Sequence, residues 1–291
     1  MTTLASMRND ADIAEVRQRV QSAGSSFYWA MRFVSRAKSD ALFAIYAFCR
    51  EVDDIADGDA APEDKRAALA EWRGRIARLY ESGEADVSVA RALVPAIQRF
   101  NLLRADFEAV IAGMEMDADG PMIAPPLATL DLYCDRVASA VGRLCVCVFG
   151  DSGPNGVAVA YHLGRALQLT NIMRDVVEDA TIDRLYLPAE LLAARGVLVT
   201  TPRDVLRHPH ICKVIGDVGL MATQAFVDAE KALTKCDPRA MRPAVVMMRV
   251  YRRTLERLRA DGWRLRPPAK GLHKMVLRAE KLALAFYYGL V

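Results

Sequence analysis

Apolar residues recur every three or four positions through long stretches of the chain, which is the pattern of amphipathic helices. A clear instance comprises Leu42, Ile45, Cys49, Val52 and Ala56. No stretch sustains the alternation with a period of two that marks half-buried strands. Prolines and glycines separate the helical patterns from one another. The patterns predict helices near residues 10–22, 39–57, 63–82, 88–100, 103–117, 128–149, 156–180, 202–236, 239–261 and 269–289.

The predicted helices follow one another without an internal repeat or a low-complexity linker. The most loop-like stretch, ADGPMIAPPL at residues 118–127, is too short to separate two domains. A length of 291 residues allows one large domain or two small ones. Hydrophobic residues make up 53% of the chain and charged residues 26%, which excludes a disordered protein. We therefore predict a single all-α domain over residues 1–291.

Charge and targeting signals narrow the class of protein further. The 39 basic and 36 acidic residues give a net charge of +3, which is too small for a dedicated nucleic-acid-binding protein. Residues 1–20 lack the apolar segment of a signal peptide, and no run of about 18 apolar residues predicts a membrane span. Six cysteines without a CxxC pair fit reduced thiols. We expect a cytoplasmic protein with no nucleic-acid partner.

Polar side chains line one face of two predicted helices whose other positions are largely apolar. The first acidic stripe, within an arc of about 60°, consists of Tyr46, Arg50, Asp53 and Asp57. The second acidic stripe, within about 80°, consists of Gly164, Gln168, Asn171, Asp175 and Asp179. A solvated helix face is the alternative explanation for either stripe alone. Because the pattern occurs twice among apolar neighbours, we expect both stripes to face an internal cavity.

The acids of each stripe are spaced four residues apart, so they repel one another on the same helix face. Two such charges in close contact cost about 4 kcal/mol at an effective dielectric constant near 20, which a cation offsets. Oxygen ligands without histidine or cysteine favour a hard ion such as Mg²⁺, which completes its shell with water and substrate phosphates. Arg50, Arg174 and Arg184 lie beside these acids, although each alone could be a surface charge. Together the carboxylates and arginines predict a diphosphate site.

Other cofactor chemistries lack their sequence signals. The chain has no HExxH motif or Cys/His cluster for zinc, and no GxxxxGK[ST] motif for a nucleotide. A strand-linked GxGxxG and a GxSxG motif are also absent from the sequence.

Three ordered segments of the chain resemble the squalene/phytoene synthase family. They read SSFYWAMRFVSRAKSDALFAIYAFCREVDDIAD, YCDRVASAVG and LGRALQLTNIMRDVVEDATIDRLYLP. The resemblance is dense from Ser25 to Pro188 and looser to Tyr251 and beyond. It implies the all-α isoprenoid synthase fold, with helices around a central apolar cavity. It also implies a prenyltransferase that joins two prenyl diphosphates head to head.

The resemblance assigns a role to each candidate residue. It implies that Mg²⁺ binds to Asp53, Asp57, Asn171, Asp175 and Asp179, and that the four aspartates are catalytic. Residues expected near the phosphates are Arg50, Arg174 and Arg184. Residues expected at the reaction cavity are Tyr46, Tyr133, Gln168 and Tyr251, with Tyr46 and Tyr133 catalytic. Substrate contacts are also expected at Ser26 and Phe27, preceded here by Ser25 where several relatives carry a basic residue.

One segment departs from the commonest form of the family. In YCDRVASAVG, Asp135 and Arg136 replace the aromatic pair of phytoene and dehydrosqualene synthases. With the GMEMD sequence at 113–117, this resembles the bacterial branch that converts two farnesyl diphosphates to presqualene diphosphate and stops there. Separate enzymes then complete squalene for hopanoid synthesis, so coupling to those enzymes is expected. Arg136 is predicted to hold the second diphosphate, with an exposed arginine as the alternative.

Several alternatives remain open from the sequence. The chain could be a phytoene, dehydrosqualene or full squalene synthase, a class I terpene cyclase, or a non-catalytic relative. Either Tyr133 or the released diphosphate could accept the proton that the reaction loses, and Tyr133 could instead be an ordinary packed tyrosine. The basic and apolar run at 272–291 is a candidate for peripheral contact with the inner face of the membrane, with a packed last helix as its alternative.

Overall fold

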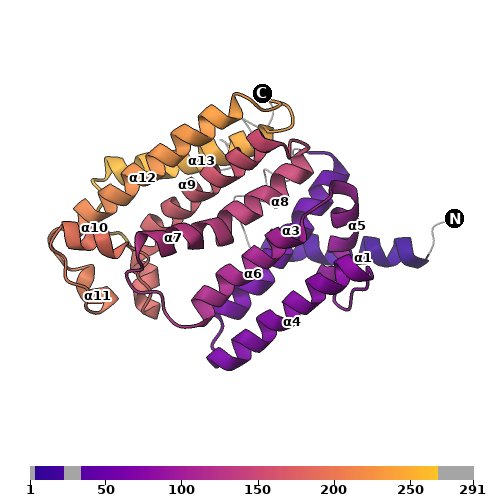
Figure 1. Cartoon of the computed structure of the whole chain (residues 1–291), viewed down its shortest axis with the longest axis horizontal. Coiled ribbons are helices and arrows are strands. Elements are labelled where there is room, and N and C mark those ends of the chain that lie inside the picture. The colour runs from indigo at the N-terminus through magenta and orange to yellow at the C-terminus, as the bar shows by residue number, and fades with distance from the viewer. Residues whose placement is uncertain (1–3, 23–33, 268–291) are drawn as a thin grey trace.

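The computed structural model describes residues 4–22 and 34–267, and Figure 1 shows the arrangement of their helices. The α-helices are α1 (Leu4–Ser22), α3 (Arg36–Asp57), α4 (Pro62–Glu81), α5 (Ser88–Phe100), α6 (Arg104–Ala118), α7 (Leu127–Cys134), α8 (Ala140–Phe149), α9 (Pro154–Asp179), α10 (Ala189–Ala194), α11 (Pro202–Val205), α12 (Ile211–Leu233) and α13 (Arg242–Ala260). A π-helical turn, η1 (Asp135–Ser139), joins α7 to α8, and a 3₁₀ turn, η2 (Ala180–Ile182), follows α9. The described residues contain no strand, which confirms the all-α prediction.

Most predicted helices form with ends shifted by a few residues, but the continuous helix predicted over 202–236 is wrong. The chain instead forms α11, breaks, and begins α12 at Ile211. Pro209 lies in the break, where it has no backbone N–H to donate and its ring obstructs the preceding turn. The short helix α10 was not predicted, and the helix predicted over 128–149 contains η1. The helix predicted over 269–289 lies outside the described residues.

The continuous path from α7 through η1 to α8 packs between α6 and α9 and runs antiparallel to both. Along α6, Gly113 faces Arg136 and Val137, whereas Asp117, one turn later, bonds to the earlier residue Tyr133. Ser139 likewise faces Gly164 of α9 in a close backbone contact. Helices α6 and α9 therefore point their carboxyl ends toward the same end of the bundle, and Figure 1 shows α6, α8 and α9 lying side by side.

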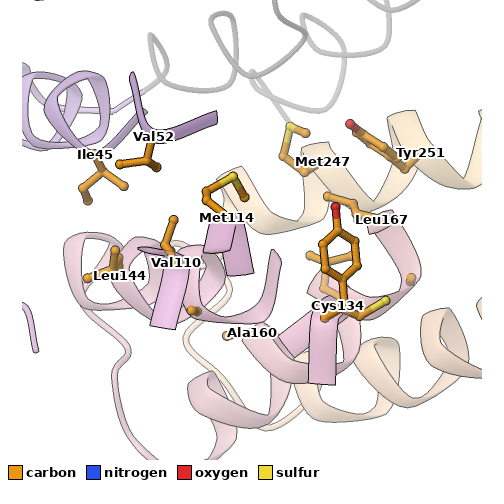
Figure 2. Close-up of a cluster of buried hydrophobic side chains, with 14 of the residues drawn as sticks. Ile45, Val52, Val110, Met114, Cys134, Leu144, Ala160, Leu167, Met247 and Tyr251 are labelled. Atoms are coloured by element: carbon orange, nitrogen blue, oxygen red, sulfur yellow. The ribbon is translucent and has the colours of Figure 1, made fainter. Parts of the chain in front are cut away.

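Apolar side chains from these helices fill the interior. Figure 2 shows Ile45 and Val52 of α3 beside Val110 and Met114 of α6, with Leu144 of α8 close by. All of these side chains are buried. The apolar face that periodicity predicted for α3 is therefore the face that packs on its neighbours.

An aromatic cluster holds α3 against α4 and α6. Phe48 is fully buried and meets the rings of Trp72 and Phe107 edge-on, with centroids 5.4 and 5.2 Å away. Edge-to-face contacts of this kind stabilise packing beyond the burial of apolar area alone.

Among the described residues, no helix is both long and apolar enough to cross a bilayer.

Replacing Phe48 by alanine tests this packing. The variant leaves a cavity where α3, α4 and α6 meet, so we expect it to lower the free energy of unfolding by about 3–5 kcal/mol. Urea denaturation followed by circular dichroism measures the loss. The matched control is Leu103→Ala, since Leu103 is 59% exposed, and its effect should stay within about 0.5 kcal/mol. A similar effect of both variants would contradict the packing described here.

Candidate active site

Carboxylates from three helices gather at one end of the bundle. Asp53 and Asp57 lie at the end of α3, Asp117 at the end of α6, and Asp175 and Asp179 at the end of α9. They are close enough to act on one another, because Asp57 raises the pKa of Asp53 and Asp117, and Asp117 raises that of Asp179. The structure therefore brings the two predicted acidic stripes together and adds Asp117 between them.

Acidic side chains outnumber the arginines that pair with them at this acidic end. Burial, reinforced by Asp57, raises the pKa of the Asp53 carboxyl to about 6. Burial, reinforced by Asp175, raises the pKa of Asp179 to about 7. The carboxyl ends of helices carry partial negative charge of their own, which adds to the repulsion. A cation or cationic side chains at this end therefore stabilise the charged carboxylates.

The three predicted arginines each pair with an acid at this end. Nη1 of Arg184 donates to Oδ1 of Asp57 at 2.6 Å, and Arg184 also holds down the pKa of Asp117 and Asp179. It therefore interacts with all three acid-bearing helices.

The other two arginines bind acids on their own helices. Arg174 makes a bidentate pair with Asp175, with N–O distances of 2.7 and 2.5 Å. The hydroxyl of Tyr251, on α13, lies within hydrogen-bonding reach of Arg174 and joins this pair to the last described helix. Arg50 donates to Asp53 at 2.9 Å.

Asn171 supplies an acceptor oxygen that has no donor. Its Oδ1 is buried without a hydrogen-bond partner, while its amide group donates to Gln168 at 3.5 Å. An orphaned buried acceptor costs about 1–3 kcal/mol, which a bound cation would offset. In the described part of the chain, no group of three or more acidic, histidine or cysteine side chains converges closely enough to hold a metal unaided. The donor set thus fits an ion such as Mg²⁺ that takes one or two carboxylates and relies on substrate phosphates for the rest.

Asp117 is a site residue that the sequence reasoning missed. It is buried and accepts hydrogen bonds from Tyr133 at 2.8 Å and from Tyr186 at 2.7 Å. The two tyrosine rings stack with centroids 5.1 Å apart. Burial and the neighbouring carboxylate raise the pKa of Tyr133 well above 10, so its phenol is neutral. The available signal was an acid that follows the apolar residues Met114 and Met116 in the GMEMD sequence, at the end of a predicted helix.

Two further predicted residues, Tyr46 and Arg136, lie within the described ranges. Tyr46 is half-buried and packs against the core on the same helix as the first acidic stripe. Arg136 lies on η1, is half-buried, and forms no hydrogen bond or ion pair within the described ranges. Ser26, Phe27 and the run at 272–291 lie outside the described residues.

A pocket of about 280 Å³ opens between α7, α9 and α12. Its lining includes Leu130, Arg165 and Met221, and contains none of the predicted site residues. The acidic end, and not this pocket, is therefore the candidate active site.

The fold defines the class of protein to which the chain belongs. It is the all-α isoprenoid synthase fold, since the structure superposes on the crystal structure of a dehydrosqualene synthase in complex with ligand with a TM-score of 0.82, at 24% identity over 98% of each chain. The model of the squalene/phytoene synthase family matches residues 20–277, and the chain belongs to that family. It is therefore a prenyltransferase.

Two curated relatives that are similar to the chain over most of its length share one name. The chain is 44% identical over 269 residues to a presqualene diphosphate synthase of Rhodopseudomonas palustris, covering 92% of this chain and 94% of the relative. It is 42% identical over 287 residues to a presqualene diphosphate synthase of Sinorhizobium fredii, covering 98% of this chain and 100% of the relative.

The raised pKa of Asp179 predicts how stability depends on pH. The folded protein keeps this proton up to about pH 7, whereas the unfolded chain loses it near pH 3.9. The stability that the protonated carboxyl contributes is thus present below about pH 4 and is lost as the pH rises to about 7. We expect Asp179→Asn to weaken this decline and to melt roughly 3 °C higher than the unmodified protein at pH 8.

Melting temperatures measured in EDTA at pH 5 and pH 8 check this expectation. The control is Glu84→Gln, because Glu84 is exposed and lies beyond the end of α4, far along the bundle from the acids. An Asp179→Asn variant that melts no higher than the control at pH 8 would show that repulsion at the acidic end does not limit stability.

Proposed function

We propose that this protein joins two molecules of farnesyl diphosphate head to head, with Mg²⁺, and releases presqualene diphosphate and diphosphate. The convergence of both acidic stripes on Arg184 carries the proposal, because it provides one place where cations and a guanidinium can hold diphosphate oxygens. The similarity to two presqualene diphosphate synthases over nearly the whole chain supports the choice of substrate and product.

The proposed metal ligands come from both stripes. Asp53 and Asp57 would bind Mg²⁺ from α3, and Asn171, Asp175 and Asp179 would bind it from α9. When bound, Mg²⁺ supplies positive charge that stabilises a departing diphosphate. In this proposal Arg184 and Arg174 give up some of their hydrogen bonds to carboxylates and donate to diphosphate oxygens instead. The guanidinium group suits both, because its donors match carboxylate and phosphate geometry.

The reaction would begin with cleavage of the C1–O bond of one farnesyl diphosphate, which gives an allylic cation and diphosphate. The double bond of the second farnesyl chain then attacks the cation, and loss of a proton closes the cyclopropane ring. Water has to be excluded while the cation exists, since it would trap the cation as an alcohol. We assign that exclusion to the side chains that line the inner ends of the stripes, including Tyr46 and Gln168, with Ser26 and Phe27 from outside the described residues.

The hydrogen bonding of Tyr133 bears on which group removes the proton. Its hydroxyl hydrogen is donated to Asp117, and its pKa is well above 10. A neutral phenol whose proton is already engaged is a weak general base. We therefore favour the released diphosphate as the proton acceptor and assign Tyr133 the role of orienting the reacting chain. Tyr251 would similarly hold Arg174 in place.

Product analysis tests the proposed function. Purified protein is incubated with farnesyl diphosphate and Mg²⁺, with and without NADPH, and products are identified by mass spectrometry before and after phosphatase treatment. We expect a C30 diphosphate to accumulate in both cases. This product would leave for the separate enzymes that form squalene.

Other outcomes would overturn the proposal in distinguishable ways. Squalene formed only with NADPH would indicate a full squalene synthase, and dehydrosqualene without NADPH a dehydrosqualene synthase. A C40 product from geranylgeranyl diphosphate alone would indicate a phytoene synthase. Absence of turnover would indicate a non-catalytic relative.

Arg136→Tyr tests the proposal that Arg136 retains the diphosphate of the product. Removing this half-buried cation should allow some presqualene diphosphate to ionise and react further, so uncharged C30 products should appear beside the diphosphate. Arg136→Lys keeps the charge and should keep a single product. An unchanged product at an unchanged rate in Arg136→Tyr would exclude this role.

A further inference from the structure

The turn η1 fits between two glycines that face it from opposite sides. On α6, a Cβ at Gly113 would lie 2.6 Å from Cγ1 of Val137. On α9, a Cβ at Gly164 would lie 2.7 Å from both the Cα and the N of Ser139. Real Cβ atoms essentially never have contacts shorter than 3.0 Å, and both distances are shorter than that. Glycine therefore fits at each position without a shift of the neighbouring atoms, and a residue with a Cβ does not.

Polar contacts prevent η1 from moving aside. Arg143 donates to Asp106 of α6 at 2.5 Å and to Asp135, at the start of η1, at 2.8 Å. At the other end of η1, the hydroxyl of Ser139 donates to the carbonyl oxygen of Tyr161 on α9 at 3.0 Å. The turn is therefore bonded to both neighbouring helices, and an added atom at either glycine has to widen the separation between η1 and α6 or α9 against these bonds.

These glycines lie on the same helices as the acidic end. Asp117 follows Gly113 by one helical turn, about 6 Å along α6, and Asn171 follows Gly164 by about two turns, roughly 10 Å along α9. Gly164 is also the first member of the second acidic stripe, so the contact with η1 lies on the face that carries the acids. A displacement of α9 at Gly164 is thus transmitted along a rigid helix to the carboxylates.

We propose that Gly113 and Gly164 are positioning residues, whose missing side chains let α6 and α9 approach η1 closely and thereby set the separation of the carboxylates at the acidic end. This inference rests on the proposed function in one respect, namely that those carboxylates share Mg²⁺ and diphosphate. The packing part of the inference does not depend on the reaction.

Alanine variants test the proposal in the full chain. In Gly164→Ala the new Cβ has to move from 2.7 Å to at least 3.4 Å from the Ser139 backbone, so α9 should shift relative to α6 in a crystal structure. A graded comparison is Gly142→Ala, on α8, where a Cβ would lie 3.1 Å from Ala160 of α9 and requires a smaller shift. The control is Gly74→Ala on α4, with ordinary contacts at 3.6 Å.

The functional readout is the Mg²⁺ concentration that gives half of the thermal stabilisation by Mg²⁺ with inorganic diphosphate. We expect Gly164→Ala and Gly113→Ala to raise this concentration roughly tenfold or more, because small misplacements of converging groups have large effects. Gly142→Ala should raise it less than Gly164→Ala does, and Gly74→Ala should leave it within about twofold. In Gly113→Ala, adding Val137→Ala removes the closest contact, with Cγ1, and should restore most of the original Mg²⁺ dependence, while Cβ of Arg136 stays at 3.0 Å.

The outcomes separate the two proposals. A Gly164→Ala structure with α6 and α9 unmoved would overturn the packing argument, and moved helices with an unchanged Mg²⁺ dependence would overturn the positioning role. If the unmodified protein shows no stabilisation by Mg²⁺ and diphosphate, the proposed function fails, while the crystal structures still decide the packing part. Should Gly164→Ala not fold, the Gly113→Ala variant and its Val137→Ala rescue decide the positioning role.

Discussion

Negative charge at the common carboxyl end of α3, α6 and α9 is the constraint on which the arrangement of the site depends. Each helix brings at least one carboxylate to that end, and their partial charges add to the repulsion. Burial, and after it the neighbouring carboxylates, raises the pKa of Asp53 and Asp179. The fold keeps these helices together through their apolar faces and through Arg184, which pairs with Asp57 and acts on the acids of the other two helices.

The same repulsion provides the means of binding. In the proposed function, Mg²⁺ and, through it, diphosphate oxygens would offset this repulsion, so stability given up in the free protein would be recovered on binding. Asp117 differs from the half-buried Asp53, Asp175 and Asp179 because two tyrosine hydroxyls satisfy it in the interior. It therefore connects the charged end to the buried packing around η1, where glycines set how closely the helices approach.

The fold class and most helices could be predicted because apolar spacing is a local property of the chain. The errors arose where a local signal was ambiguous. Pro209 ends the helical pattern, yet the apolar residues on either side of it continue with helical spacing, so α11 and α12 were predicted as one. The π-helical turn η1 fits closely between α6 and α9, and nothing in the spacing of residues 128–149 signals that fit.

The sequence by itself determined an all-α protein with two helices that each present acids on one face, because helical periodicity places residues four apart together. The sequence also places Arg50, Arg174 and Arg184 beside these acids, and the family resemblance assigns them to the phosphates. Only the tertiary structure decided that the two stripes meet, that Arg184 pairs across helices with Asp57, and that Asp117 receives both Tyr133 and Tyr186. These contacts join residues that are 16 to 127 positions apart in the chain, so their proximity arises from helix packing and leaves no local pattern.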